Sequence, residues 1–208
     1  MTQATAILLN YLRPENMVKV IASIRIQQPA VDIWLWNNNP QDVRAYDVDE
    51  RFNASSNFVC WPRWLMGGLA RTKYIFTLDD DLMFTDANII RDCIKYMEVN
   101  DANIIGYMGV KLNYNDYWKG QHIKAGKVDE VVDVVKGRFA FMRTSLLNKV
   151  SILNEHHDDL KVCGAAKKLV VPAFLKDRFE QLPEGDEAFC KLPDHKESRQ
   201  RAVNKYIR

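Results

Sequence analysis

Apolar and polar residues follow one another along the first half of the chain in a way that predicts strands and helices in turn. Short apolar runs of strand type lie at 5–9, 32–36, 58–60, 74–78 and 103–110. Apolar residues at helical spacing fill the intervening segments 14–24, 62–71 and 86–97. Pro14 and Pro62 suit the first position of a helix, and Thr85 or Asp86 suits the cap of the third. Strands alternating with helices predict an α/β fold with a mostly parallel central sheet flanked by helices.

The second half of the chain has a different pattern. Segments 129–135 and 138–143 are strand-like and lie close together in sequence around Gly137. The polar stretch 154–168 predicts a loop. We expect a helix at 144–150, a last strand at 169–172 and the start of a short helix at 185–192. Because neither an internal repeat nor a linker interrupts the pattern, residues 1–208 are predicted to form one domain.

Composition excludes several classes of protein. The 208 residues are 47% hydrophobic and 27% charged, which is typical of a globular protein and not of a disordered one. The N-terminus lacks the features of a signal peptide, and no apolar run approaches the roughly 20 residues that span a bilayer. We therefore expect a soluble, cytoplasmic protein. The cysteines form no CxxC pair, which argues against a zinc knuckle or a disulfide framework: Cys60, Cys93, Cys163 and Cys190.

Three adjacent carboxylates follow a buried-looking strand in the sequence YIFTLDDDLMF, residues 74–84. Ligands of open parallel sheets bind outside the carboxyl ends of the strands, so the triplet lies where a site is expected. Alternate residues face opposite ways, so Asp79 and Asp81 can point together. Hard oxygen ligands of this kind suit Mg²⁺ or Mn²⁺ together with a substrate diphosphate. The alternative is an acidic turn that caps the next helix.

Several segments, in order, carry a family resemblance. They are LLNYLRPENMVKVIASI, IWLWNNN, FTLDDDLMF, VVKGRFAFMRTSLL and PEGDEAFCKL. Together they resemble nucleotide-sugar glycosyltransferases of the GT-A fold, and among those they are most similar to the exostosin-type (glycosyltransferase family 64-like) enzymes. The resemblance covers roughly residues 5–192. It implies a Rossmann-like central sheet with a small antiparallel strand pair on the acceptor side.

The resemblance also implies a role for each matched residue. Leu9, Asn10, Tyr11 and Arg13 would bracket the nucleotide base and diphosphate, and Asn37 and Asn38 would lie by the base or ribose. Asp79 and Asp80 would lie at the donor, with Asp81 and Asp79 as metal ligands for Mn²⁺ or Mg²⁺. Gly137 and Arg138 would line the acceptor side. Asp186 and Glu187 would be the catalytic carboxylates, although a helix N-terminus is an alternative interpretation of this acidic pair.

Other residues have two interpretations each. His195 is either a third metal ligand or a surface residue, and Arg199 and Arg201 either clamp the diphosphate or form part of the basic C-terminal segment. Trp118 is either a stacking platform for a sugar or a half-buried core residue. His156 and His157, beside Asp158 and Asp159, are predicted to lie in a solvated loop in preference to a second metal site. The spacing of Trp61 and Trp64 indicates core.

The predicted function is metal-dependent transfer of a hexosyl or N-acetylhexosaminyl group from a nucleotide-diphosphate sugar, with UDP favoured, to a hydroxyl acceptor, with a glycan favoured. One alternative acceptor is a hydroxymethylated base of DNA, for which the basic C-terminal segment is the support. A second alternative is a nucleotidyltransferase, but the segment after the first strand, NYLRPEN, has no glycine to cradle a triphosphate. A third is a non-catalytic module that binds a sugar or a divalent ion.

Overall fold

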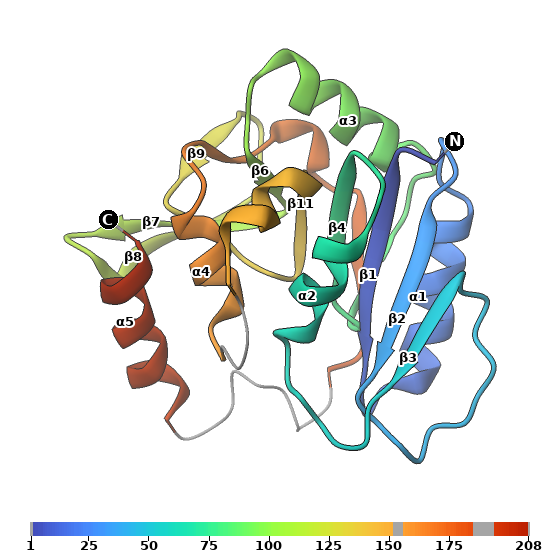
Figure 1. Cartoon of the computed structure of the whole chain (residues 1–208). Helices are drawn as coiled ribbons and strands as arrows, with labels where there is room; N and C mark the ends of the chain where they lie inside the picture. Colours follow the sequence, from blue (N-terminus) through green and yellow to red (C-terminus); the bar gives the residue numbers. More distant parts are fainter. Residues whose placement is uncertain (1, 152–155, 185–193, 208) are drawn as a thin grey trace.

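A large mixed sheet forms the centre of the molecule. The computed structural model describes residues 2–151, 156–184 and 194–207. Within these residues the sheet has eight strands in the order β3-β2-β1-β4-β11-β6-β12-β9 (Figure 1). They are β1 (Ala4–Asn10), β2 (Asp32–Asn37), β3 (Glu50–Asn53), β4 (Tyr74–Leu78), β6 (Ile104–Gly106), β9 (Glu130–Val132), β11 (Phe139–Arg143) and β12 (Leu169–Val171). β1 pairs in parallel with both β2 and β4, which confirms the predicted parallel half.

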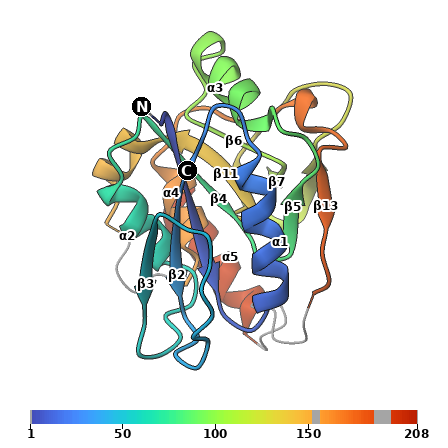
Figure 2. The same cartoon turned by 90° about the vertical axis from the view of Figure 1, so that its right-hand side faces the viewer.

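Helices flank this sheet. The first two, α1 (Pro14–Arg25) and α2 (Pro62–Leu69), begin at the predicted prolines and lie on opposite sides of β1 (Figure 2). The third, α3 (Ile89–Val99), buries the predicted face. The others are α4 (Asp158–Gly164), α5 (His195–Tyr206), which packs against α4, and the 3₁₀ helices η1 (Thr144–Lys149) and η2 (Ala173–Leu175). Among the described residues, none of these helices has the length and apolar character needed to cross a membrane.

Two small antiparallel sheets complete the fold. One contains β7 (Met108–Asn113) between β8 (Asp116–Lys124) and β10 (Val134–Val135), and the other pairs β5 (Leu82–Phe84) with β13 (Phe179–Gln181). A small antiparallel strand pair was expected from segments 129–135 and 138–143, and part of the first segment, β10, does lie in a small sheet. β11 instead enters the central sheet, antiparallel to both β4 and β6.

Other predicted elements differ from the structure. Segment 58–60 is not a strand, and its place at the sheet edge is taken by β3. The run 103–110 is divided at Tyr107 into β6 and β7, which belong to different sheets. A Cβ at Gly106 would lie 2.3 Å from Cγ1 of Val135, so glycine permits the close approach of β10 at this division. The predicted loop 154–168 contains α4, whose polar first turn is buried by partners distant in sequence.

The core holds the central strands in place. Every residue of β4 is buried, and its Phe76 packs against Phe139 and Phe141 of β11 with ring centroids 6.0 and 6.1 Å apart. Trp64 is buried as predicted, and Trp61 is half-buried against the same core. Protein interiors of this kind are close-packed, so the ends of β4 and β11 are fixed relative to one another. They therefore offer a rigid support for the residues that follow β4 and precede β11.

Candidate active site

A cavity of about 690 Å³ opens at the carboxyl ends of β1 and β4. This is the side of a parallel sheet on which ligands bind. Its walls come from segments far apart in sequence: the turns after β1, β2 and β4, the start of β11, and parts of α2, α4, α5 and β8. Predicted site residues that line it are Leu9, Tyr11, Arg13, Asn38, Asp79, Asp80, Asp81, Gly137, Arg138, His195 and Arg199.

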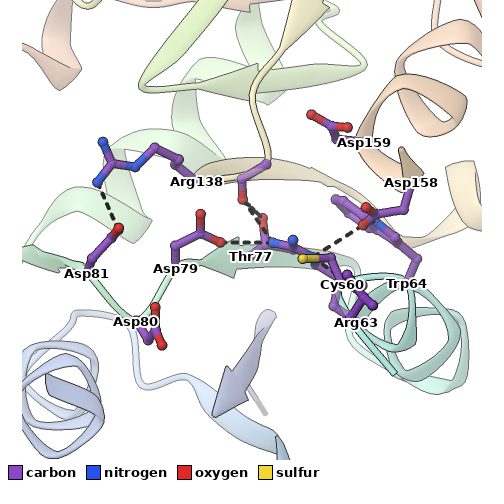
Figure 3. A network of polar contacts seen from close by, with 12 residues as sticks. Cys60, Arg63, Trp64, Thr77, Asp79, Asp80, Asp81, Arg138, Asp158 and Asp159 are labelled. Atoms are coloured by element: carbon purple, nitrogen blue, oxygen red, sulfur yellow. Dashed lines mark hydrogen bonds and ion pairs between the residues drawn. The ribbon is translucent and has the colours of Figure 1, made fainter. Parts of the chain in front are cut away.

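The acidic triplet lies at the end of β4, as the sequence predicts. Because β11 runs antiparallel to β4, the residue that enters β11 meets the residue that leaves β4: the backbone N–H of Asp79 donates to the carbonyl of Arg138 at 2.9 Å. This pairing brings the Arg138 guanidinium to 2.8 Å from Oδ1 of Asp81 (Figure 3). The residue predicted for the acceptor side is thus an ion-pair partner of the triplet.

Each carboxylate of the triplet has an arginine partner. Arg13 contacts Oδ1 of Asp80 at 2.6 Å and Oδ2 of Asp81 at 3.4 Å. Arg63 contacts Oδ1 of Asp79 at 3.0 Å. Burial raises the pKa of Asp80 to about 7; the charge of Arg13 opposes this rise, and the neighbouring carboxylates add to it. Three like charges are therefore tolerated here because three guanidinium groups lie among them.

A second acidic pair lies in the same cavity, at the first turn of α4. Oδ2 of Asp158 accepts a hydrogen bond from Nε1 of Trp64 and lies 3.3 Å from Nε of Arg63. Both oxygens of Asp159 are held by Arg199, at 3.1 and 2.8 Å. The expectation of a solvated loop here is wrong: Asp158 and His157 are buried, because arginines from α2 and α5 compensate the charges.

The two carboxyls of this pair differ in acidity. Burial raises the pKa of Asp158 to about 6, although the charge of Arg63 opposes the rise. Burial also acts on Asp159, but the charge and hydrogen bonds of Arg199 outweigh it and lower the pKa of Asp159. Two neighbouring carboxyls with pKa values moved in opposite directions are typical of sites that perform acid–base chemistry.

Arg63 connects the two acidic groups. Its Nη1 donates to Asp79 and, at 3.2 Å, to the carbonyl of Gly137, while its Nε donates to the carbonyl of Cys60 and faces Asp158 (Figure 3). Sequence reasoning missed this residue. The available signal was an arginine directly after Pro62 in the otherwise apolar helix PRWLMGGL, where a charge needs a buried partner.

Aromatic side chains form part of the cavity wall, among them Tyr117 and Trp118. Trp118 of β8 lines the cavity with 37% of its surface exposed, and its Nε1 donates to the carbonyl of Lys196 at 3.0 Å. His195 lies beside it, with ring centroids 6.1 Å apart, and the guanidinium of Arg199 lies 4.6 Å from the ring centre of Tyr117. Trp118 therefore occupies a position where a sugar ring can stack.

Three of the predicted site residues lie elsewhere in the described part of the chain. Asn10 and Asn37 are buried beneath the cavity, where Nδ2 of Asn10 donates to Oδ1 of Asn37 and to Oδ2 of Asp42, at 2.9 and 2.7 Å. They support the turn that carries Asn38 and do not line the cavity. Arg201 is outside the cavity, exposed and 4.0 Å from Glu197. Asp186 and Glu187 lie outside the described residues.

The metal site predicted at Asp81, Asp79 and His195 stays a prediction. All three residues line the cavity, and the two aspartates offer the hard oxygen ligands that Mg²⁺ and Mn²⁺ prefer. In the ranges 2–151, 156–184 and 194–207, no three His, Cys, Asp or Glu side chains lie close enough together to hold an ion by themselves. Mg²⁺ is usually held by one or two carboxylates together with water and substrate phosphates, so the two aspartates suit a cation that takes its further ligands from these sources.

Comparison with known proteins shows which solved structures have a similar fold. No protein-family model and no curated protein sequence matches the chain. Among solved structures, S. aureus TarS 1–349 in complex with UDP-GlcNAc is similar over 97% of this chain and 65% of its own, with a TM-score of 0.70 and 13% identity. The mannosyltransferase PcManGT from Pyrobaculum calidifontis, in complex with GDP-Man and Mn²⁺, is similar over 83% of this chain and 55% of its own, with a TM-score of 0.60 and 13% identity.

These likenesses show a shared fold. The chain spans 37% of the full TarS structure and 55–65% of the two ligand-bound structures above. The α/β fold of GT-A type, expected from the resemblance, is confirmed by them. Their ligands are nucleotide-diphosphate sugars, and one of them is accompanied by a divalent cation.

Proposed function

We propose that residues 1–208 act as one glycosyltransferase domain of GT-A type, which transfers a sugar from a nucleotide-diphosphate sugar to a hydroxyl acceptor. The observation that carries the proposal is the single cavity that joins the arginine-paired triplet Asp79–Asp81 to the acidic pair of α4. A diphosphate needs cationic groups at one end of such a site, and an acceptor hydroxyl needs a base at the other.

The donor occupies the end of the cavity near β1 and β4 in this proposal. Tyr11 and Asn38 line the part beside the base and ribose, and Arg13 and Arg138 present guanidinium groups that match phosphate oxygens. Asp81 and Asp79 would hold Mn²⁺ or Mg²⁺ together with the diphosphate. When bound, the cation would neutralise the charge of the departing nucleoside diphosphate. A UDP-sugar is the favoured donor in this proposal.

Asp158 is the carboxylate that best suits the general base. Its two anchoring contacts both use Oδ2, and its raised pKa, about 6, is close to that of an effective base near neutral pH. Asp159 is saturated by Arg199 and has a lowered pKa, so it serves to fix α5 against α4. The sequence predicted Asp186 and Glu187 for catalysis, and they lie outside the described residues. In this proposal Asp158, which lines the cavity, takes the role of the base.

In the proposed reaction one bond forms, one bond breaks and one proton moves. The acceptor hydroxyl, held beside Trp118, loses its proton to Asp158 as its oxygen bonds to the anomeric carbon. The bond between that carbon and the diphosphate oxygen breaks at the same time, and the nucleoside diphosphate leaves with the electron pair. Arg13 and Arg138 receive the negative charge that develops on the leaving group.

Calorimetric titration tests the donor site. We expect UDP or GDP to bind the wild type more tightly with Mn²⁺ than without it, and Asp81→Ala to lose this metal-dependent part. The variant Asp158→Asn, which keeps the shape of the side chain, should bind the same nucleotide normally and lose transfer by at least about 100-fold, as removal of a general base does. Failure of every nucleoside diphosphate to bind the wild type would refute the proposal.

A further inference from the structure

Guanidinium groups already compensate the triplet before any ligand arrives. Three carboxylates, Asp79 to Asp81, face three guanidinium groups within 3.4 Å, those of Arg13, Arg63 and Arg138. A divalent cation added to this group alone would place two further positive charges in a partly buried site beside those guanidinium groups. Such charge is costly to hold away from water unless an anion accompanies it.

Both carboxylate oxygens of Asp81 already face an arginine. Its Oδ1 is 2.8 Å from Arg138 and its Oδ2 is 3.4 Å from Arg13. Mg²⁺ binds a carboxylate oxygen at about 2.0–2.1 Å, so a cation on Asp81 would lie close to the guanidinium group of Arg138, which contacts the same carboxylate. The two positive charges repel one another, and this repulsion favours movement of an arginine away from Asp81 when the cation binds.

Arg138 is the arginine best placed to move. Its side chain is 25% exposed, whereas that of Arg63 is 7% exposed and is held by Asp79, Asp158 and two backbone carbonyls. Arg13 has a second partner in Asp80, at 2.6 Å. Arg138 also contacts Gln181 on β13, and it lines the cavity.

We propose that Arg138 is an internal counter-ion that stands in for the cation at Asp81 and transfers to the donor diphosphate when the cation binds. The cation and the nucleoside diphosphate then bind together, and neither binds well alone. This inference rests on the proposed donor site. In this proposal the diphosphate supplies the cation with the ligands that Asp79 and Asp81 do not provide.

The test measures Mn²⁺ binding without any nucleotide, from the electron paramagnetic resonance signal of free Mn²⁺. We expect Arg138→Gln to bind Mn²⁺ at least tenfold more tightly than the wild type, because Asp81 loses the positive charge that lies 2.8 Å from its Oδ1. Arg138→Lys, which keeps the charge, should stay within about threefold of the wild type. Arg91→Gln, an exposed residue of α3 outside the cavity, is the matched control and should change nothing.

A second measurement adds UDP and GDP. In the wild type one of them should tighten Mn²⁺ binding at least tenfold, and this gain should be smaller in Arg138→Gln. Equal Mn²⁺ affinity of Arg138→Gln and the wild type without nucleotide, in variants with unchanged thermal melting, would overturn the inference. Absence of nucleotide binding in the wild type would instead refute the donor site itself, and the comparison made with Mn²⁺ alone would still report on the counter-ion.

Discussion

Replacing Arg63 with methionine tests whether one buried cation holds the two acidic groups together. Methionine keeps most of the side-chain volume and removes the charge. The wild-type guanidinium lies 3.3 Å from Asp158, and the two side chains are 7% and 4% exposed. Removing it leaves the Asp158 carboxylate buried without its cation, which in other proteins costs about 3–5 kcal/mol. Asp79 adds little to this figure because its side chain is 33% exposed and water can replace the arginine.

The loss should depend on pH. Burial raises the pKa of Asp158 from 3.8 to about 6, so the folded state binds this proton more tightly than the unfolded state does. The free energy of unfolding contributed by this group is therefore highest at low pH and falls as pH rises between about 4 and 6. Because the charge of Arg63 lowers this pKa, the variant should have a still higher value, and its stability should continue to fall above pH 6.

Urea denaturation at pH 5 and pH 8 measures the effect. We expect Arg63→Met to lose about 3–5 kcal/mol of unfolding free energy at pH 8, and clearly less at pH 5, where Asp158 is protonated in the variant. Arg91→Met, which removes an exposed arginine, should change stability by less than about 0.5 kcal/mol at either pH. A loss below about 1 kcal/mol at pH 8, or an equal loss at both pH values, would refute the reasoning.

Three further substitutions test other parts of the structure. Trp118→Ala should lower kcat/KM for the acceptor about tenfold, equivalent to about 1.4 kcal/mol, and leave nucleotide affinity measured by calorimetry unchanged. Gly164→Ala should destabilise the fold by about 1–3 kcal/mol in denaturant titrations, because the new Cβ would lie 2.1 Å from the carbonyl oxygen of Tyr206. Gly68→Ala, in α2, meets nothing within 4 Å, so it should raise stability by up to about 1 kcal/mol and serves as the matched control. Equal effects of the two alanines would contradict this account.

Local patterns were enough to predict the part of the cavity at the ends of β1 and β4. The apolar runs of β1, β2 and β4, and the prolines that open α1 and α2, are signals carried by neighbouring residues, so they survive without knowledge of the fold. The rule that ligands bind at the carboxyl ends of parallel strands then predicts a site at Asp79 to Asp81, and the family resemblance adds Arg13. All four residues line one cavity.

The other half depends on contacts that no local pattern carries. Asp158 and Asp159 look like loop residues until Arg63 and Arg199, 95 and 40 positions away, neutralise them. The strand β8 was missed because its residues are mostly exposed and polar, which removes the alternation that marks a half-buried strand. The position of β11 between β4 and β6 follows from long-range pairing, so the contact of Arg138 with Asp81 could not be predicted from neighbouring residues.

The ion pair of Arg63 and Asp158, which line the cavity, limits how this protein can gain stability. A buried ion pair is often less stabilising than apolar side chains of the same volume, so some substitutions at Arg63 and Asp158 together could make the protein more heat-resistant while destroying the site. Selection for thermal resistance and selection for activity would then act in opposite directions on the same positions. A protein that must keep both its thermal resistance and its activity has to gain stability away from the cavity. Substitutions on the exposed side of α2 are one example, because they leave the ion pair of Arg63 and Asp158 unchanged.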